Sequence, residues 1–167
     1  NLSCLVLLLG LMACFDPEPA PEPPPPEPEP FYRFEGLSFF DASGSPVGVA
    51  DTSDWTLTDR WEEWEAELFE ENFSLNCPVP ADLRLVAFPN PVTGPMTLSI
   101  AKTDSLPTRL AMRLVDEKLN VRLQTDSSFA DTVTLNLDIL EPDTFRLYYK
   151  FIRGGCEWRG HGDILKE

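Results

Sequence analysis

The sequence predicts a mainly β protein, an antiparallel β-sandwich with one short amphipathic helix near its N-terminus. From residue 82 onward, turn residues separate apolar and β-branched runs about every ten residues, which is the strand spacing of a sandwich. A single stretch before residue 82 has apolar residues at helical spacing. Residues 31–167 have a length that suits one compact domain, and no internal repeat is evident in them.

Residues 1–13 have the features of a targeting signal. Residues 2–13 carry no charge, and their length matches the apolar region of a signal peptide but not the roughly 20 residues that span a bilayer. The run ends in Leu11-Met12-Ala13-Cys14, which resembles the lipobox of bacterial lipoproteins. The resemblance implies cleavage before Cys14 and lipid attachment to that cysteine. Because the sequence begins at Asn1 without an initiator Met or a basic flank, we expect the natural start to lie upstream. An ordinary signal peptide, or a buried cysteine that follows by chance, is the alternative.

Residues 14–30 predict a lipidated cysteine followed by a spacer. Residues 16–30 consist of Asp, Glu, Ala and Pro, and they carry no side chain large enough to build a core. Proline favours polyproline II, so these 15 residues, at about 3.1 Å each, could hold a domain up to roughly 45 Å from the lipid. The alternative is a ligand for an aromatic groove.

The charge balance is strongly acidic, with 28 Asp and Glu against 13 Lys and Arg and a formal net charge of −15. This argues against nucleic acid as a partner, because phosphate backbones attract clustered Lys and Arg. Acidic residues shortly after a lipidated cysteine also resemble surface-export signals of lipoproteins in bacteria that use type IX secretion. That resemblance favours an outer-membrane lipoprotein on the cell surface, and the periplasmic face is the alternative.

Residues 31–81 are expected to form aromatic strands and a helix that pack on the sandwich. The runs 31–34 and 37–40 are rich in aromatic residues and are broken by turn residues, which predicts short strands. Apolar residues then recur at helical spacing, which predicts a helix from about Asp59 to Glu71. These residues are Leu57, Trp61, Trp64 and Leu68. Asp59 and Glu62 form the D-x-x-E pattern of a helix start.

The tryptophans allow two interpretations. Trp61 and Trp64 on one helix face could form a carbohydrate-stacking platform, to which Trp55 and Trp158 would add. Tryptophans at core spacing more often form a packing face, which we favour. The exposure of Trp61 and Trp64 separates the two interpretations, since a buried pair removes the platform.

Residues 82–167 contain the strands of the expected sandwich. They cover 82–88, 95–102, 109–115, 119–125, 132–138, 144–152 and 156–165. Seven short strands at this spacing predict an immunoglobulin-like arrangement. Alternation is clear in residues 132–137, where Val133, Leu135 and Leu137 should face inward. Gly154-Gly155 can supply the positive φ angles of a tight hairpin.

A family resemblance covers roughly residues 82–152. Phe88-Pro89-Asn90-Pro91-Val92-Thr93-Gly94 resembles the opening of the type IX secretion sorting domain, also called the Por secretion tail. Leu114-Val115-Asp116 resembles the family's middle strand, and residues 137–145 resemble the strands that flank its Pro-Gly-Thr-Tyr turn. The resemblance implies a sorting-domain-like β-sandwich at 82–167.

The departures from that family change the functional expectation. Glu117-Lys118 and Asp143 stand where the family has glycine, and residues 156–167 are not the short basic strand of a sorting tail. A cargo tail is also exchanged for a lipid anchor, which would be redundant on a chain already lipidated at Cys14. We therefore expect a sorting-domain-like sandwich that has become the whole protein, rather than a secretion cargo remnant.

The sequence offers little for catalysis or metal binding. His161 is the sole histidine, so a hydrolase would depend on His161 with Asp163, and a polar turn explains that segment equally well. Four aspartates could supply oxygen ligands to Ca²⁺, although capping and turn formation explain them more simply. They are Asp41, Asp51, Asp54 and Asp59. We expect no enzyme activity, catalytic residue, metal or cofactor.

Cys77 and Cys156 predict a disulfide. Cys4 leaves with the signal and Cys14 is acylated, so these two thiols remain in an exported domain, where disulfides persist. Closing a loop of about 80 residues could stabilise the folded state by up to roughly 4 to 5 kcal/mol in the chain-entropy model. The alternative is two separate buried thiols, which Cα atoms more than roughly 7 Å apart would indicate.

Three function classes remain. The first is a membrane-anchored, non-catalytic lipoprotein whose sandwich is an interaction module, with a protein partner in an outer-membrane or cell-surface assembly. The second is a glycan-binding surface lipoprotein, which needs exposed tryptophans. A hydrolase is the third, and it needs a cleft that contains His161 with Asp163.

Overall fold

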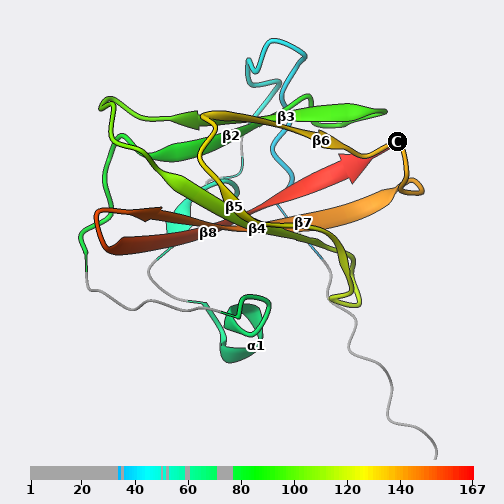
Figure 1. The fold of residues 1–167 in the computed structure, drawn as a ribbon. Coiled ribbons are helices and arrows are strands. Elements are labelled where there is room, and N and C mark those ends of the chain that lie inside the picture. Colours follow the sequence, from blue (N-terminus) through cyan, green and yellow to red (C-terminus); the bar gives the residue numbers. More distant parts are fainter. Residues whose placement is uncertain (1–33, 35, 50, 52, 59–60, 71–76) are drawn as a thin grey trace, which may run out of the picture.

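The structure is a computed structural model, and it describes residue 34 and residues 36–49, 51, 53–58, 61–70 and 77–167. Two antiparallel sheets lie one above the other (Figure 1). The five-stranded sheet has the order β1-β8-β7-β4-β5, and the three-stranded sheet has the order β2-β3-β6. The described part of the protein is therefore mainly β.

The elements have the following bounds in chain order: β1 Leu57–Thr58, α1 Glu63–Ala66, β2 Arg84–Phe88, β3 Pro95–Ala101, β4 Arg109–Val115, β5 Val121–Ser128, β6 Thr132–Asn136, β7 Asp143–Arg153 and β8 Cys156–Lys166. The seven strands expected after residue 82 are confirmed as β2 to β8, with ends that shift by a few residues. Gly154 and Gly155 both have positive φ and form the tight turn between β7 and β8.

The short strands expected in residues 31–49 do not form where the structure describes them, whereas the turn expected after Phe40 is present. Residues 36–49 form turns and isolated bridges rather than strands, and Phe40 bridges both Pro46 and Asn90. Asp41 explains the interruption, because its carboxylate accepts backbone N–H groups from Ser43 and Ser45 and closes a turn. Residues 31–33 lie outside the described part.

The helix is much shorter than expected. It covers Glu63–Ala66, and its start is at Glu62, whose N–H donates to the Glu65 carboxylate. Turns and bends follow, and the carbonyl of Leu68 accepts a hydrogen bond from Arg113 of β4. In residues 67–70 the backbone therefore contacts the sheet instead of continuing the helix. The expected ends, Asp59 and Glu71, lie outside the described residues.

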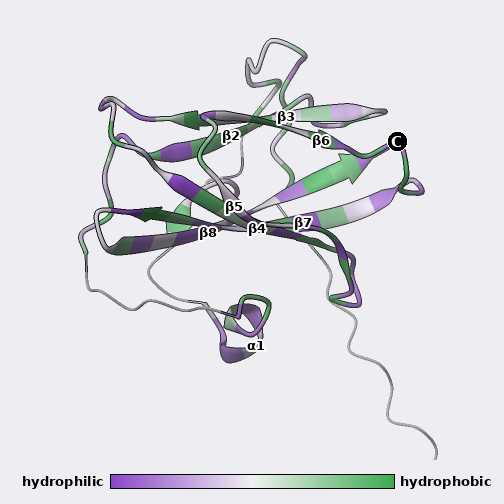
Figure 2. Cartoon of the chain, viewed as in Figure 1, coloured by the Kyte–Doolittle hydropathy of each residue, from purple (hydrophilic) through white to green (hydrophobic). Residues whose placement is uncertain are grey.

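The core lies between the two sheets. Purple and green segments alternate along the strands in Figure 2, as expected where one face is buried. Along β7 the inward residues are Phe145, Leu147, Tyr149 and Phe151, all at most 4% exposed. Leu135 and Leu137 join the same cluster, and Val133 packs against it, so the predicted inward face is confirmed.

A second apolar cluster covers the opposite face of the five-stranded sheet. It combines Phe34 and Phe69 with three sheet residues, Ala111, Val115 and Tyr148. Trp61, Trp64 and Leu68 pack against this cluster and remain partly buried. Because these residues come from the segment that contains α1, the five-stranded sheet is covered on both faces (Figure 1).

Candidate functional site

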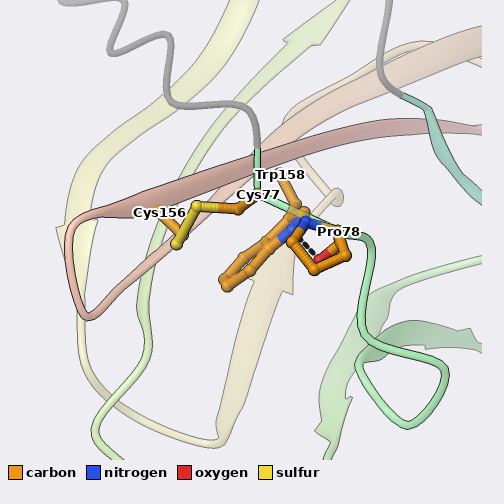
Figure 3. The surroundings of a disulfide bond; sticks show 4 residues. All are labelled: Cys77, Pro78, Cys156 and Trp158. Atoms are coloured by element: carbon orange, nitrogen blue, oxygen red, sulfur yellow. Dashed lines mark hydrogen bonds between the residues drawn. A yellow bond between two sulfur atoms is a disulfide. The ribbon is translucent and has the colours of Figure 1, made fainter.

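The predicted disulfide is confirmed. Cys77 and Cys156 are bonded, with their Cα atoms 5.8 Å apart (Figure 3). The bond ties the segment that precedes β2 to the first residue of β8. Beside it, the Trp158 indole N–H donates to the Pro78 carbonyl at 3.0 Å. Both cysteines pack against the inter-sheet core, so this is a structural cross-link.

The four tryptophans do not form an open stacking platform. Trp55 and Trp158 are each 7% exposed and belong to the inter-sheet core. Trp61 and Trp64 are partly buried, and both meet the ring of Tyr148 edge-on, with centroids 5.7 and 6.3 Å away. The structure thus places Trp55 and Trp158 on one face of the five-stranded sheet, and Trp61 and Trp64 on the other.

Packing explains the glycines around His161. This segment lies within β8, and it is not the polar turn that the sequence suggested. A Cβ atom on Gly162 would lie 2.2 Å from the Trp55 ring, and one on Gly160 would lie 2.5 Å from the Tyr149 ring. Both positions therefore admit only glycine without rearrangement. Trp55 itself has a φ of 60°, and its N–H donates to the His161 carbonyl.

His161 and Asp163 do not form a catalytic pair in this structure. The Asp163 carboxylate accepts two hydrogen bonds from the Arg146 guanidinium, at 2.6 and 2.8 Å. His161 lies beside Tyr148, and its Nδ1 atom is buried with no hydrogen-bond partner. Burial lowers the pKa of His161, and Arg146 lowers it further. The imidazole is therefore neutral at pH 7, and the carboxylate beside it is engaged by arginine.

Asp54 joins the N-terminal segment to β8. Its carboxylate accepts the backbone N–H groups of Ser38 and Asp163, each at 2.8 Å. Next to it, the Asn90 amide donates to the carbonyls of Ser38 and Asp163 and accepts the Leu165 N–H. Burial raises the pKa of Asp54 to about 6, against the opposing effect of the two N–H donors. This group of residues acts as a clasp between segments far apart in sequence.

The candidate calcium ligands are held apart in separate roles. Asp41 and Asp51 each close a turn, with Ser43 and Ser53 respectively, and their pKa values are lowered by those hydrogen bonds. Asp54 faces the clasp instead. Among the described residues no group of His, Cys, Asp and Glu is arranged to hold a metal ion, and Asp59 lies outside them.

Cations line a pocket of about 260 Å³ on the helix-covered face of the five-stranded sheet. Its lining includes Arg109, Arg113 and Lys150. Arg113 pairs with Asp126, and the Lys150 ammonium lies 3.2 Å from the Glu157 carboxylate. Because carboxylates already neutralise these two groups, the pocket is not a simple anion site.

Two apolar clefts open at opposite sides of the sandwich. The larger, of about 610 Å³, lies where β1 and β2 form the sheet edges, and its lining includes Trp55, Leu57 and Leu85. The smaller, of about 270 Å³, lies between the edge strands β5 and β6. We call this smaller cleft the β5–β6 cleft.

The β5–β6 cleft combines residues of both sheets. Leu123 comes from β5, Leu135 comes from β6, and Met112 and Leu147 come from the core behind them. Ile139, in the connection to β7, also lines the cleft and is 71% exposed. The sequence does not predict this surface, because inward-facing residues of an edge strand have the same pattern as core residues. The one available signal was Ile139, an isoleucine in a short acidic turn.

Comparison with known proteins gives no relative from which to transfer a function. No protein-family model, curated protein or solved structure matches this chain. In the part of the chain that the structure describes, no helix is sufficiently long and apolar to cross a bilayer.

Proposed function

We propose that this chain is a lipid-anchored, non-catalytic interaction module of an outer-membrane or cell-surface assembly. In this proposal Cys14 carries the lipid, residues 16–30 provide the spacer, and an immunoglobulin-like, sorting-domain-like sandwich presents a binding surface to a protein partner. The observation that carries the proposal is the β5–β6 cleft, where apolar side chains border two sheet edges that no other described strand pairs with. The carboxylates of Asp54, Asp163 and Glu157 are engaged elsewhere in hydrogen bonds and ion pairs.

The tryptophan geometry weighs against the glycan-binding alternative. Stacking on a sugar needs an open aromatic face, whereas Trp55 and Trp158 are buried in the core. Trp61 and Trp64 are partly buried against Tyr148. The hydrolase alternative loses its support with the Arg146–Asp163 pair.

Replacement of the proposed lipid-carrying cysteine tests the anchor. The chain is expressed with a methionine and lysines ahead of Asn1, and cells are labelled with an alkyne fatty acid. We expect the wild-type chain and a Cys4→Ser control to carry label and to sediment with membranes. The Cys14→Ser chain should lose both properties. If Cys14→Ser still fractionated with membranes, the anchor would be refuted.

A further inference from the structure

The β6 strand ends the three-stranded sheet with an unpaired edge. In the described chain β6 pairs with β3 on one side, and no strand pairs with its other side. The five-stranded sheet ends likewise at β5. The backbone N–H and C=O groups along such an edge are available for one more strand. The β5–β6 cleft lies directly beside this edge.

The β6 edge lacks the features that usually prevent strand addition. Residues 132–136 read Thr-Val-Thr-Leu-Asn, with no charge and no proline. By contrast, β5 carries Arg122 and Asp126. Threonine, valine and leucine in alternation also suit a pleated, half-buried strand. Large exposed apolar side chains flank β6, with Phe129 before it and Ile139 after it.

We propose that an extended segment of a partner protein adds to β6 as a fourth strand of the three-stranded sheet. This inference rests on the proposed function and names the binding mode. Main-chain hydrogen bonds to residues 132–136 would supply affinity, and alternate apolar side chains would enter the β5–β6 cleft against Leu123, Leu135 and Ile139. Polar residues between them would face the same way as Thr132 and Thr134.

Charge determines which strand fits. Asp138, Glu141 and Asp143 are all exposed in and just after the connection that leaves β6. A segment with Lys or Arg at that end gains favourable charge contacts. A second copy of this chain does not fit, since each copy carries a formal charge of −15 and antiparallel pairing of two β6 strands brings Asp131 of one near Asp138 of the other. The partner is therefore a strand with alternating apolar residues and a basic end.

Peptide binding to the intact lipoprotein in detergent micelles tests the inference. The probe is a peptide that alternates threonine and valine and ends in a pair of lysines. A second version places the lysines first, to allow either strand direction. Hydrogen exchange measured by mass spectrometry should show the β6 amides slowed by about tenfold or more with one of these peptides. The same peptide with alternate backbone amides N-methylated should give no protection, and glutamates in place of the lysines should weaken binding.

A matched pair of variants locates the site. Ile139→Ser removes an exposed cleft side chain and should weaken peptide binding by about tenfold while the fold is kept. Val49→Ser, at a residue 94% exposed and outside the cleft, should leave binding unchanged. Absence of β6 protection with both peptides, or equal loss in the two variants, overturns strand addition. If Cys14 lipidation is nevertheless as expected, the anchored interaction module survives that failure.

Discussion

The two faces of the five-stranded sheet are both covered, but by different chemistry. On the face toward the three-stranded sheet, β7 presents Leu147 and Tyr149, and β8 presents glycines opposite them. On the other face the same strands present Arg146 and Lys150, paired with Asp163 and Glu157. The first face is apolar and packs directly against the three-stranded sheet. The second face can be covered because carboxylates pair with its cations.

Aromatic rings of the N-terminal segment cover those charges. Phe34 lies over the Arg146 guanidinium at 4.7 Å, and Phe69 lies 4.9 Å from both Arg113 and the Lys150 ammonium. Each cation thus has a carboxylate beside it and a ring above it. The difference between the faces shows that a strand face with charged side chains can be buried when a separate segment packs over it and shields the charges from water.

The largest effect should come from breaking the charge balance of the helix-covered face. Glu157→Gln removes the carboxylate that faces Lys150 and Arg159, and it leaves a buried ammonium without that counter-charge. We expect a loss of about 4 kcal/mol in the free energy of unfolding at pH 7, measured by urea denaturation. The deficit should shrink at alkaline pH, because burial already lowers the pKa of Lys150 and a neutral lysine needs no partner.

A matched control for that variant is Glu141→Gln, at an exposed carboxylate. It should change stability by less than about 0.5 kcal/mol. Similar losses in the two variants would mean that the helix-covered face behaves as ordinary surface.

The inter-sheet face should respond to lost volume instead of lost charge. Leu147→Ala truncates a side chain that is 1% exposed in the middle of β7, and we expect it to cost about 3 kcal/mol with little dependence on pH. Ile139→Ala is the control, because isoleucine is the same size as leucine and Ile139 is exposed. It should lower the free energy of unfolding far less. A strongly pH-dependent cost at Leu147 would contradict the distinction between the faces.

The clasp at Asp54 should give a smaller effect with a defined sign. Burial raises its pKa in the folded protein to about 6, above the ordinary value of an aspartate, so Asp54 contributes most to stability below about pH 4 and this contribution is lost as the pH rises toward 6. The loss is about 2 to 3 kcal/mol, and it should appear as a pH-dependent difference between wild type and Asp54→Asn in urea denaturation. Asp116→Asn is the control of opposite sign, because hydrogen bonds from Asn120 and Lys118 help to lower the pKa of Asp116.

The smallest effect is expected at an ordinary surface pair. Arg122 and Asp116 approach to 3.7 Å, and the Arg122 side chain is 47% exposed. Arg122→Ala should lower stability by no more than about 0.5 kcal/mol, and salt should reduce the effect further. A large loss in thermal denaturation would show that β5 depends on this pair.

Local pattern explains which parts of the fold were predictable. Alternation in Thr132–Asn136 and the glycine turn at residues 154–155 are local signals, and both are confirmed. The disulfide was predicted by counting the thiols that remain if the chain is exported and lipidated as expected, and it is confirmed. The end of the helix was not predictable, because it depends on a hydrogen bond from Arg113, which is distant in sequence, to the Leu68 carbonyl.

The candidate surface was less predictable than the fold. Arg146 and Lys150 look exposed in sequence, but Phe34 and Phe69, far away along the chain, cover them, so that Arg146 is partly buried and Lys150 is buried. The β5–β6 cleft depends on where the two sheets stop, which no local pattern encodes. Conversely, the expectation that Trp61 and Trp64 pack rather than form a platform came from spacing alone and agrees with their contacts to Tyr148.

The clasp and the disulfide together have a mechanical consequence. Asp54 accepts the backbone N–H of Asp163 in β8, a strand inside the larger sheet, and Ser38 is linked to that strand through Asp54 and Asn90. A pull on the chain before Phe34 is therefore resisted first by these bonds and is transmitted to β8. Beyond them, the covalent bond from Cys77 to Cys156 prevents the 79-residue interval between these cysteines from lengthening under load. Strands β2 to β7 lie inside that interval, so force applied from the N-terminal side can strip away the preceding segment without extending them.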